Sequence, residues 1–182
     1  NLEAAIDWDA VKGTCGIGHT RWATHGAPNQ VNAHPHQADK VALVHNGIIE
    51  NHTALRVKLS KNGHKFLSDT DTEVLAHLIE DLYDGDLVHA VQLALGVVEG
   101  AFGIAVTHVD HPNLIVGARR GSPLVVGVGD GMNYLGSDVA AIMEHTRQVA
   151  ERLRLAIDAH SFFSNASGKA NKITVSCGLA AY

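Results

Sequence analysis

The segment HTRWATHG, residues 19–26, governs the interpretation of the whole chain because it concentrates a guanidinium, two imidazoles, two hydroxyls and an indole. It holds no acid that would neutralise Arg21 and no aliphatic residue larger than alanine, so it would pack poorly in a core. Residues 15–18, just before it, are typical of a short buried strand. Arg21 offers a planar fork of five donors that suits bidentate binding of a carboxylate. We therefore expect a carboxylate-bearing ligand at the end of this strand.

The composition of the chain excludes several classes of protein. Its 182 residues fit one domain, and 46% hydrophobic against 18% charged residues is typical of a globular protein. The net charge of -5 argues against a general nucleic-acid-binding role, which needs a surplus of lysine and arginine. No apolar run reaches the roughly 20 residues of a membrane span, and residues 1–15 lack a signal-peptide pattern. We expect a cytoplasmic protein that contacts neither nucleic acid nor a membrane.

The spacing of cysteines and histidines favours neither disulfides nor a metal. Cys15 and Cys177 are too few for a disulfide framework and neither belongs to a CxxC pair, so we expect both to be reduced. The 13 histidines are spread along the chain, and only His34 and His36 form a tight pair. Without an HExxH motif or a companion cysteine, that pair does not predict a metal site. A hydrogen-bonded structural role is a better interpretation of the pair than a role in catalysis. The sequence predicts no metal and no other cofactor.

A second polar stretch, HNG at residues 45–47, follows the apolar run 41–44, which is typical of a buried strand. An Asn-Gly pair is a turn signal. A hairpin would continue in alternating residues, whereas Leu55 to Gly63 has the spacing and the closing glycine of a helix. We therefore place residues 45–47 at a strand-to-loop transition, an exposed strand end that suits chemistry.

A helix is expected over residues 74–82, with Thr70 or Asp71 as its N-cap. Asp71 therefore has two open interpretations, a cap or a ligand-binding residue. The other expected elements are a loop at 27–40, a helix near 87–98, strands at 101–109, 114–118, 124–129 and 133–136, and a loop at 119–123. Strands clustered in this way predict an α+β fold with antiparallel sheets covered by helices. No dinucleotide fingerprint and no Walker sequence is present.

Five motifs together resemble the glutaminase domain of the glutamine–fructose-6-phosphate aminotransferases, a family of class-II glutamine amidotransferases. They occur in the family's order over about residues 1–149: HTRWATHG at 19–26, VNAHPH at 31–36, VHNGIIEN at 44–51, TDTEV at 70–74 and GSPL at 121–124. The related amidophosphoribosyltransferases have a different arginine motif. The tryptophan after Arg21 therefore favours the sugar aminotransferases.

The resemblance implies an Ntn-hydrolase fold, a four-layer αββα sandwich of antiparallel sheets. It implies that a cysteine at the mature N-terminus attacks the side-chain amide of glutamine. A separate sugar-isomerase domain would then use the released ammonia to convert fructose 6-phosphate to glucosamine 6-phosphate, which supplies amino-sugar biosynthesis. The parent enzyme would be a homodimer.

The resemblance also assigns roles at the two charged ends of glutamine. Arg21 would hold the α-carboxylate, assisted by hydrogen bonds from Thr24 and His25, and Asp71 would hold the α-ammonium. An amino-acid ligand has one negative and one positive end, so an unpaired arginine and an aspartate from separate loops suit it chemically.

Further roles follow at the reacting end of glutamine. The side-chain amide of Asn46 and the backbone N–H of Gly47 would form the oxyanion hole. Trp22 would act as a gate where ammonia departs, with plain packing in a core as the alternative for a tryptophan.

The chain departs from the family pattern at both ends. It opens with Asn1 in what is typical of a helix remnant, so we expect the nucleophilic cysteine and the family's N-terminal strand to be missing from it. Cys15 imitates the family's opening Cys-Gly-Ile, but it sits inside the chain without a free α-amine. Residues 150–155 are typical of a helix. We expect residues 150–182 as a whole not to match the family, and we expect the sugar-isomerase domain to be missing from this chain. We expect such a fragment to be catalytically inactive.

Two other interpretations stay open. In the first, the chain is the glutaminase half of a different class-II amidotransferase, which delivers ammonia to another acceptor. In the second, it is a non-catalytic glutamine-binding module.

Overall fold

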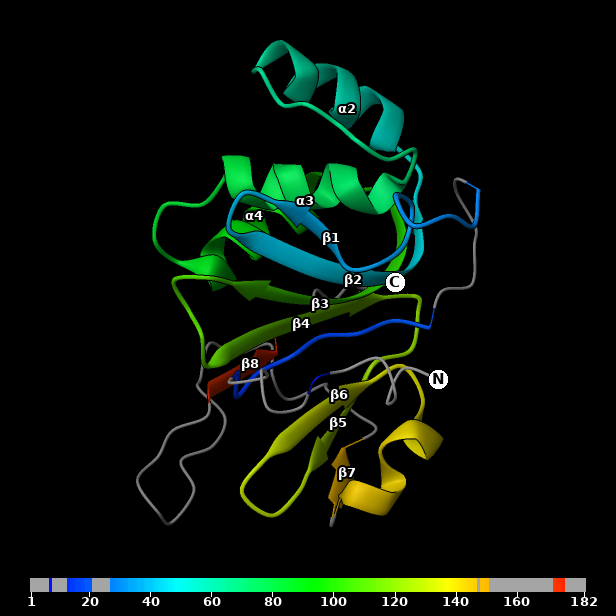
Figure 1. The fold of residues 1–182 in the computed structure, drawn as a ribbon, viewed down its shortest axis with the longest axis vertical. Helices are drawn as coiled ribbons and strands as arrows, with labels where there is room; N and C mark the ends of the chain where they lie inside the picture. The colour runs from blue at the N-terminus through cyan, green and yellow to red at the C-terminus, as the bar shows by residue number, and fades with distance from the viewer. Residues whose placement is uncertain (1–6, 8–12, 21–26, 147, 151–171, 176–182) are drawn as a thin grey trace.

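The structure is a computed structural model that describes residues 7, 13–20, 27–146, 148–150 and 172–175. Two of its α-helices pack on one of two β-sheets, and the other packs on the outer side of a helix (Figure 1). The helices are α2 (His52–Lys61), α3 (Asp71–Asp81) and α4 (Leu87–Val97). The strands are β1 (His36–Ala38), β2 (Val41–Ile49), β3 (Gly100–His108), β4 (Leu114–Arg120), β5 (Val125–Val128), β6 (Asn133–Gly136), β7 (Gln148–Ala150) and β8 (Lys172–Val175). Two short 3-10 helices, η1 (Val139–Ala141) and η2 (Met143–His145), follow β6.

The first sheet has the strand order β1-β2-β3-β4-β8. Its pairs are antiparallel except for β4 with β8, which are parallel. The longest pair is β2 with β3, whose register runs without interruption from Val41 opposite His108 to Ile49 opposite Gly100. This pair forms the centre of the sheet, and the candidate site residues Asn46 and Gly47 belong to it.

The main core lies between the first sheet and helices α3 and α4. Alternate residues of β3 face the helices, and Phe102, Ile104 and Val106 are at most 1% exposed. They belong to the same buried cluster as Leu75 and Ile79 of α3 and Val91 of α4. Burying a side chain of this size contributes about 1.5–3 kcal/mol, so the cluster holds the helical layer firmly on the sheet.

Helix α3 begins at a fully formed N-terminal cap. The hydroxyl of Thr70 accepts a hydrogen bond from the Glu73 backbone N–H at 3.2 Å. The Glu73 carboxylate accepts in turn from the backbone N–H groups of Leu67 and Ser68, at 2.8 and 2.7 Å. Of the two expected caps, Thr70 is therefore the N-cap, and Asp71 lies inside the first turn.

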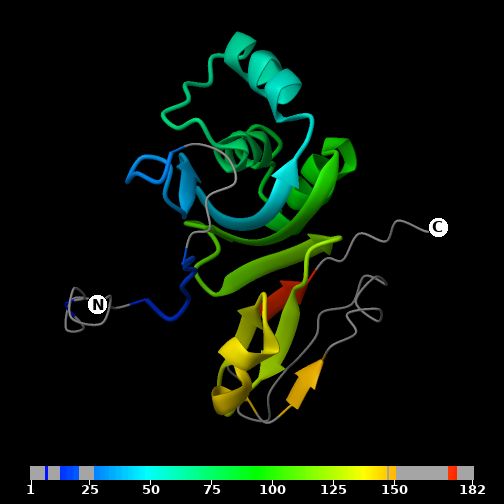
Figure 2. The ribbon, with the colours of Figure 1, turned by 90° about the vertical axis from the view of Figure 1, so that its right-hand side faces the viewer.

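The second sheet has the strand order β6-β5-β7 and lies on the face of the first sheet that is opposite the helices (Figure 2). The two sheets approach closely at Gly117 of β4, where an added Cβ would lie 3.0 Å from Leu135 and 3.3 Å from Leu124. Ile142 packs beside Gly127 and Gly136, so the η1–η2 segment covers the outer face of β5 and β6. The described residues thus form three layers, helices, sheet and sheet.

The predicted α+β class is confirmed, and so are the helices expected near 74–82 and 87–98. A loop was expected at residues 119–123, but Arg119 and Arg120 are the last two residues of β4. The strand is longer because its pairing with β3 continues to Arg119, which lies opposite Gly103. The Arg120 guanidinium then lies 4.9 Å from the centre of the Phe102 ring and donates to the carbonyls of Val98 and Leu95. Of the helix expected at 150–155, Ala150 lies in β7 and the rest falls outside the described residues. Within the described part of the chain, no helix is long and apolar enough to cross a membrane.

Candidate active site

Asn46 and Gly47 lie inside β2, opposite Gly103 and Phe102 of β3. The expected strand-to-loop transition at residues 45–47 is therefore wrong, because the strand pair continues to Ile49. Gly47 makes the continuation possible: its φ is +130°, and a Cβ there would overlap the carbonyl oxygen of Ala101. The Asn-Gly pair marks a close approach of two strands rather than a turn.

Neighbouring residues of β2 point to opposite faces of the sheet. The Nδ1 of His45 lies 3.0 Å from the Thr72 hydroxyl of α3, so His45 faces the helices. Asn46 therefore faces the other side, where its Oδ1 lies 2.8 Å from Nε2 of His19. The His19 ring stacks on His34, with the ring centres 4.4 Å apart and the planes inclined by 28°. The amide of Asn46 is thus held by the first residue of the HTRWATHG motif.

Residues 13–20 do not contain the strand expected at residues 15–18. Cys15 is exposed and Ile17 is only half-buried. Gly16 and Gly18 flank Ile17 and offer no side chain to pack, which weakens a strand at this place. The segment instead contributes single contacts, and the hydrogen bond from His19 to Asn46 lies at the candidate site.

Three imidazoles surround the start of α3. Nε2 of His34 lies 3.1 Å from the Thr72 hydroxyl, to which His45 also bonds. Nε2 of His36 lies 3.1 Å from the hydroxyl of Thr70. The expectation that His34 and His36 are hydrogen-bonded is confirmed. Among the described residues, no group of three or more His, Cys, Asp or Glu side chains is arranged to hold a metal ion.

Asp71 connects the first turn of α3 to the end of β2. The residue is 3% exposed, and its Oδ2 accepts the backbone N–H of Ile49 at 2.8 Å. Nδ1 of His45 lies 4.0 Å from the same oxygen. A carboxylate oxygen carries two lone pairs, so Asp71 retains acceptor capacity beyond this backbone contact. Ile49, which donates this hydrogen bond to Asp71, is the last residue of β2 and follows Gly47 by two residues. Asp71 is therefore attached to the end of β2 that contains Gly47.

The other four expected ligand-binding residues, Arg21, Trp22, Thr24 and His25, lie outside the described residues. Their roles stay predictions. The loop that follows them is anchored near α3: the Asn32 side chain donates to the Ala27 carbonyl at 3.0 Å and accepts the Asp69 backbone N–H at 3.0 Å. Ala27, the first described residue after the polar motif, is therefore linked through Asn32 to the segment just before α3.

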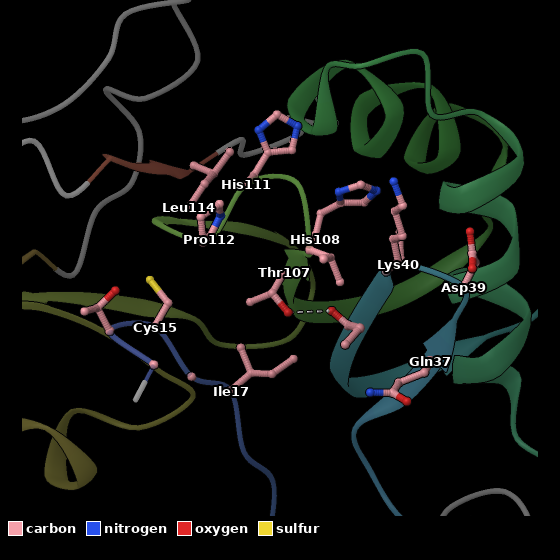
Figure 3. Close-up of a pocket in the computed structure, with 16 residues that line it drawn as sticks. Cys15, Ile17, Gln37, Asp39, Lys40, Thr107, His108, His111, Pro112 and Leu114 are labelled. Carbon is pink, nitrogen blue, oxygen red and sulfur yellow. Dashed lines mark hydrogen bonds between the residues drawn. The ribbon is translucent and has the colours of Figure 1, made fainter. Parts of the chain in front are cut away.

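A cleft of about 400 Å³ opens beside residues 13–17 (Figure 3). Its wall includes Cys15, Lys40 and Thr107, but not Asn46, Gly47 or Asp71, so it is separate from the candidate site. Although Cys15 is exposed overall, desolvation at this wall raises the pKa of its thiol. A higher pKa means less thiolate, which disfavours Cys15 as a nucleophile.

Three residues make contacts at the candidate site that the sequence did not predict: His19, His45 and Thr72. All three lie inside motifs that the sequence makes conspicuous, yet nothing in a linear pattern shows that His19 meets Asn46, 27 residues away. Thr72 bridges two histidines only after α3 has docked on β2.

Comparison with known proteins decides the family. The chain matches the glutamine amidotransferase domain over residues 7–175, which is most of its length. It belongs to this family. The matched range includes every candidate site residue and extends past residue 149, where the sequence alone suggested a boundary.

The relatives of this glutamine amidotransferase domain include two bacterial enzymes, both named glutamine–fructose-6-phosphate aminotransferase (isomerizing). The protein from Thermus thermophilus is 53% identical over 150 residues, which cover 81% of this chain and 25% of that protein. The protein from Streptomyces coelicolor is 56% identical over 140 residues, which cover 75% of this chain and 23% of that protein. The chain thus spans about a quarter of the length of these relatives.

Two solved structures share the fold. One is the Bacillus subtilis glutamine phosphoribosylpyrophosphate amidotransferase complexed with ADP and GMP, with a TM-score of 0.57 and 27% identity over 70% of this chain and 29% of that one. The other, described as the allosteric regulatory enzyme of purine biosynthesis, has a TM-score of 0.55 and 25% identity over 64% of this chain and 26% of that one. Their likeness to this chain confirms the expected Ntn-hydrolase-like sandwich, of which the described residues form three of the four expected layers.

Proposed function

We propose that this chain is the glutamine-hydrolysing part of a glutamine–fructose-6-phosphate aminotransferase. Hydrolysis adds water across the C–N bond of the side-chain amide of glutamine and yields glutamate and ammonia. The ammonia then passes to fructose 6-phosphate, which is converted to glucosamine 6-phosphate. The observation that carries the proposal is the 53% identity to the Thermus thermophilus aminotransferase over 150 residues.

The nature of the acceptor rests on the same comparison. Identity to the phosphoribosylpyrophosphate amidotransferase structure is 27%, about half of the identity to the sugar aminotransferases. The tryptophan that follows Arg21 is a further feature of the sugar enzymes that this chain shares.

Glutamine would be held at its two charged ends. Arg21 would grip the α-carboxylate in a bidentate fashion, with Thr24 and His25 as hydrogen-bonding neighbours. Asp71 would accept the α-ammonium, and its position beside the end of β2 supports this assignment. Trp22, next to Arg21 in the chain, would gate the exit of ammonia. No metal or other cofactor takes part in this scheme.

The reacting end of glutamine would meet Asn46 and Gly47. When a nucleophile attacks the amide carbon, the carbonyl oxygen becomes an oxyanion, and donors that already point at its position stabilise it. The Asn46 side-chain N–H and the Gly47 backbone N–H are such donors. Their location in the central strand pair supports the role, because a long, paired strand holds donors more rigidly than a loop does.

The location, the assembly and the substrates of the whole protein follow from the same proposal. We expect a cytoplasmic enzyme that works as a homodimer. Its small-molecule substrates would be glutamine and fructose 6-phosphate.

The test is a product assay on the full-length gene product that contains this sequence. With glutamine and fructose 6-phosphate, we expect glutamate and glucosamine 6-phosphate in equal amounts. Product formation only with phosphoribosyl pyrophosphate as acceptor would assign the chain to another class-II amidotransferase. Glutamine binding without glutamate release under either condition would make it a non-catalytic binding module.

A further inference from the structure

The hydrogen bond between His19 and Asn46 fixes the orientation of the Asn46 amide. An amide oxygen only accepts hydrogen bonds, so Nε2 of His19 must donate to Oδ1 of Asn46, at 2.8 Å. The amide nitrogen of Asn46 then lies on the other branch of the side chain, with its two N–H donors directed away from His19. An amide rotated by half a turn would present its oxygen to a developing oxyanion, and like charges would repel.

His19 is itself held in place. Its ring is stacked on His34, with a centre-to-centre distance of 4.4 Å. Nε2 of His34 lies 3.1 Å from the hydroxyl of Thr72, which is 1% exposed in the first turn of α3. Nδ1 of His45, the neighbour of Asn46 in β2, bonds to the same hydroxyl at 3.0 Å. The Asn46 amide is therefore connected through the stacked rings of His19 and His34 to helix α3. The same hydroxyl of α3 also contacts β2, through the His45 ring.

We propose that His19 is a positioning residue for the reaction: it locks the Asn46 amide in the orientation that presents N–H donors to the oxyanion. The inference rests on the proposed function, because it needs Asn46 to be an oxyanion donor. It goes further by naming the group that orients this donor. Preorganised donors stabilise a transition state without reorganising during the reaction, and a supporting side chain supplies that preorganisation.

Two substitutions of His19 separate its hydrogen bond from its packing. His19→Phe keeps an aromatic ring to stack on His34 but removes the donor. His19→Gln loses the ring but carries an amide N–H at about the distance from the backbone where Nε2 of histidine lies. A role in packing alone predicts that Phe is the better replacement, whereas a positioning role predicts that Gln is better.

The experiment is steady-state glutaminase kinetics of the full-length gene product, with melting temperatures as a check on folding. We expect His19→Phe to lower kcat about tenfold to a hundredfold, with the glutamine KM unchanged within about threefold, because the donor acts in the transition state. We expect His19→Gln to recover most of the lost kcat. Equal kcat in wild type and His19→Phe, or a loss that Gln fails to recover, overturns the inference.

A double variant distinguishes this inference from the proposed function. If His19 acts through Asn46, then His19→Phe adds little to the loss in kcat already caused by Asn46→Ala. Losses that multiply would show that His19 acts independently and would refute the positioning role. If Asn46→Ala alone leaves kcat unchanged, the oxyanion role in the proposed function fails. If Asn46→Ala lowers kcat and His19→Phe does not, only the present inference fails.

Discussion

Gly47 in β2 and Ala101 in β3 approach so closely that a side chain at position 47 would overlap the Ala101 carbonyl oxygen. Gly47 also has a φ of +130°, which residues with a side chain rarely adopt. Gly47→Ala therefore meets both backbone strain and a steric clash. We expect it to lower the free energy of unfolding by at least about 2 kcal/mol.

Gly63→Ala is the matched control for this prediction. Gly63 has a φ of +97°, but an added Cβ would meet nothing within 4 Å. We expect Gly63→Ala to lower the free energy of unfolding by about 1 kcal/mol, which is the contribution of backbone strain alone. Urea unfolding of the purified protein measures both values. An equal loss in the two variants would mean that the approach of Gly47 to Ala101 contributes nothing.

The position of Gly47 illustrates what the sequence does and does not reveal. Helices α3 and α4 were predictable because caps and apolar spacing are local signals: Thr70 and Asp86 cap helices whose apolar residues recur at helical intervals. The length of β2 was not, because Gly47 continues the strand only in the presence of its partner β3. An Asn-Gly pair looks the same in a turn and in such a strand pair.

The candidate site, too, was predictable from the sequence only in part. Motifs led to Asn46, Gly47 and Asp71, whose residue types suit the chemistry. The contacts that orient them were not predictable, because His19 reaches Asn46 across 27 residues and Asp71 reaches Ile49 across 22. A side-chain contact over such a separation depends on tertiary packing, which a local pattern does not encode.

Cys15 is expected to be dispensable for catalysis. The raised pKa of its thiol leaves less thiolate at neutral pH than an ordinary exposed cysteine has. We expect Cys15→Ser to retain the glutaminase activity of the full-length gene product. We also expect iodoacetamide to alkylate Cys15 with a pH midpoint above the ordinary cysteine value of about 8.5. Loss of glutamate release in the serine variant would instead identify Cys15 as a nucleophile.

Arg21→Lys tests the carboxylate-binding role. Lysine keeps the charge but replaces a bidentate fork with a single point charge. Because a charged hydrogen bond contributes about 1.5–3 kcal/mol, we expect the glutamine KM to rise about tenfold to a hundredfold. Steady-state kinetics with varied glutamine measures it. An unchanged KM would remove Arg21 from this role.

His108 is expected to make the protein sensitive to acid. It is 3% exposed and stacks on Tyr83, with the ring centres 4.0 Å apart. Burial lowers its pKa, although Asp110 nearby acts in the opposite direction. The unfolded state then binds the proton more tightly than the folded state does. The stability is complete above the unfolded pKa of about 6.5 and falls as the pH drops from there towards the folded pKa.

The substitution His108→Phe keeps a ring against Tyr83 and removes the titrating group. We expect the melting temperature of this variant to fall less between pH 7 and about pH 5 than that of the wild type. The exposed His89 supplies the control, since His89→Gln also removes one imidazole but no buried one. The same acid-induced drop in His108→Phe and in the wild type would contradict the prediction.

Asn46→Ala in the full-length gene product tests whether Asn46 stabilises the oxyanion formed during glutamine hydrolysis. The quantities to measure are the glutaminase kcat and the glutamine KM. Removal of one oxyanion donor typically costs about a hundredfold to a thousandfold in kcat. We expect a loss of that size with a glutamine KM within about threefold of the wild type, because the donor acts mainly in the transition state. A kcat equal to that of the wild type, or an effect on KM alone, would show that Asn46 does not stabilise the oxyanion.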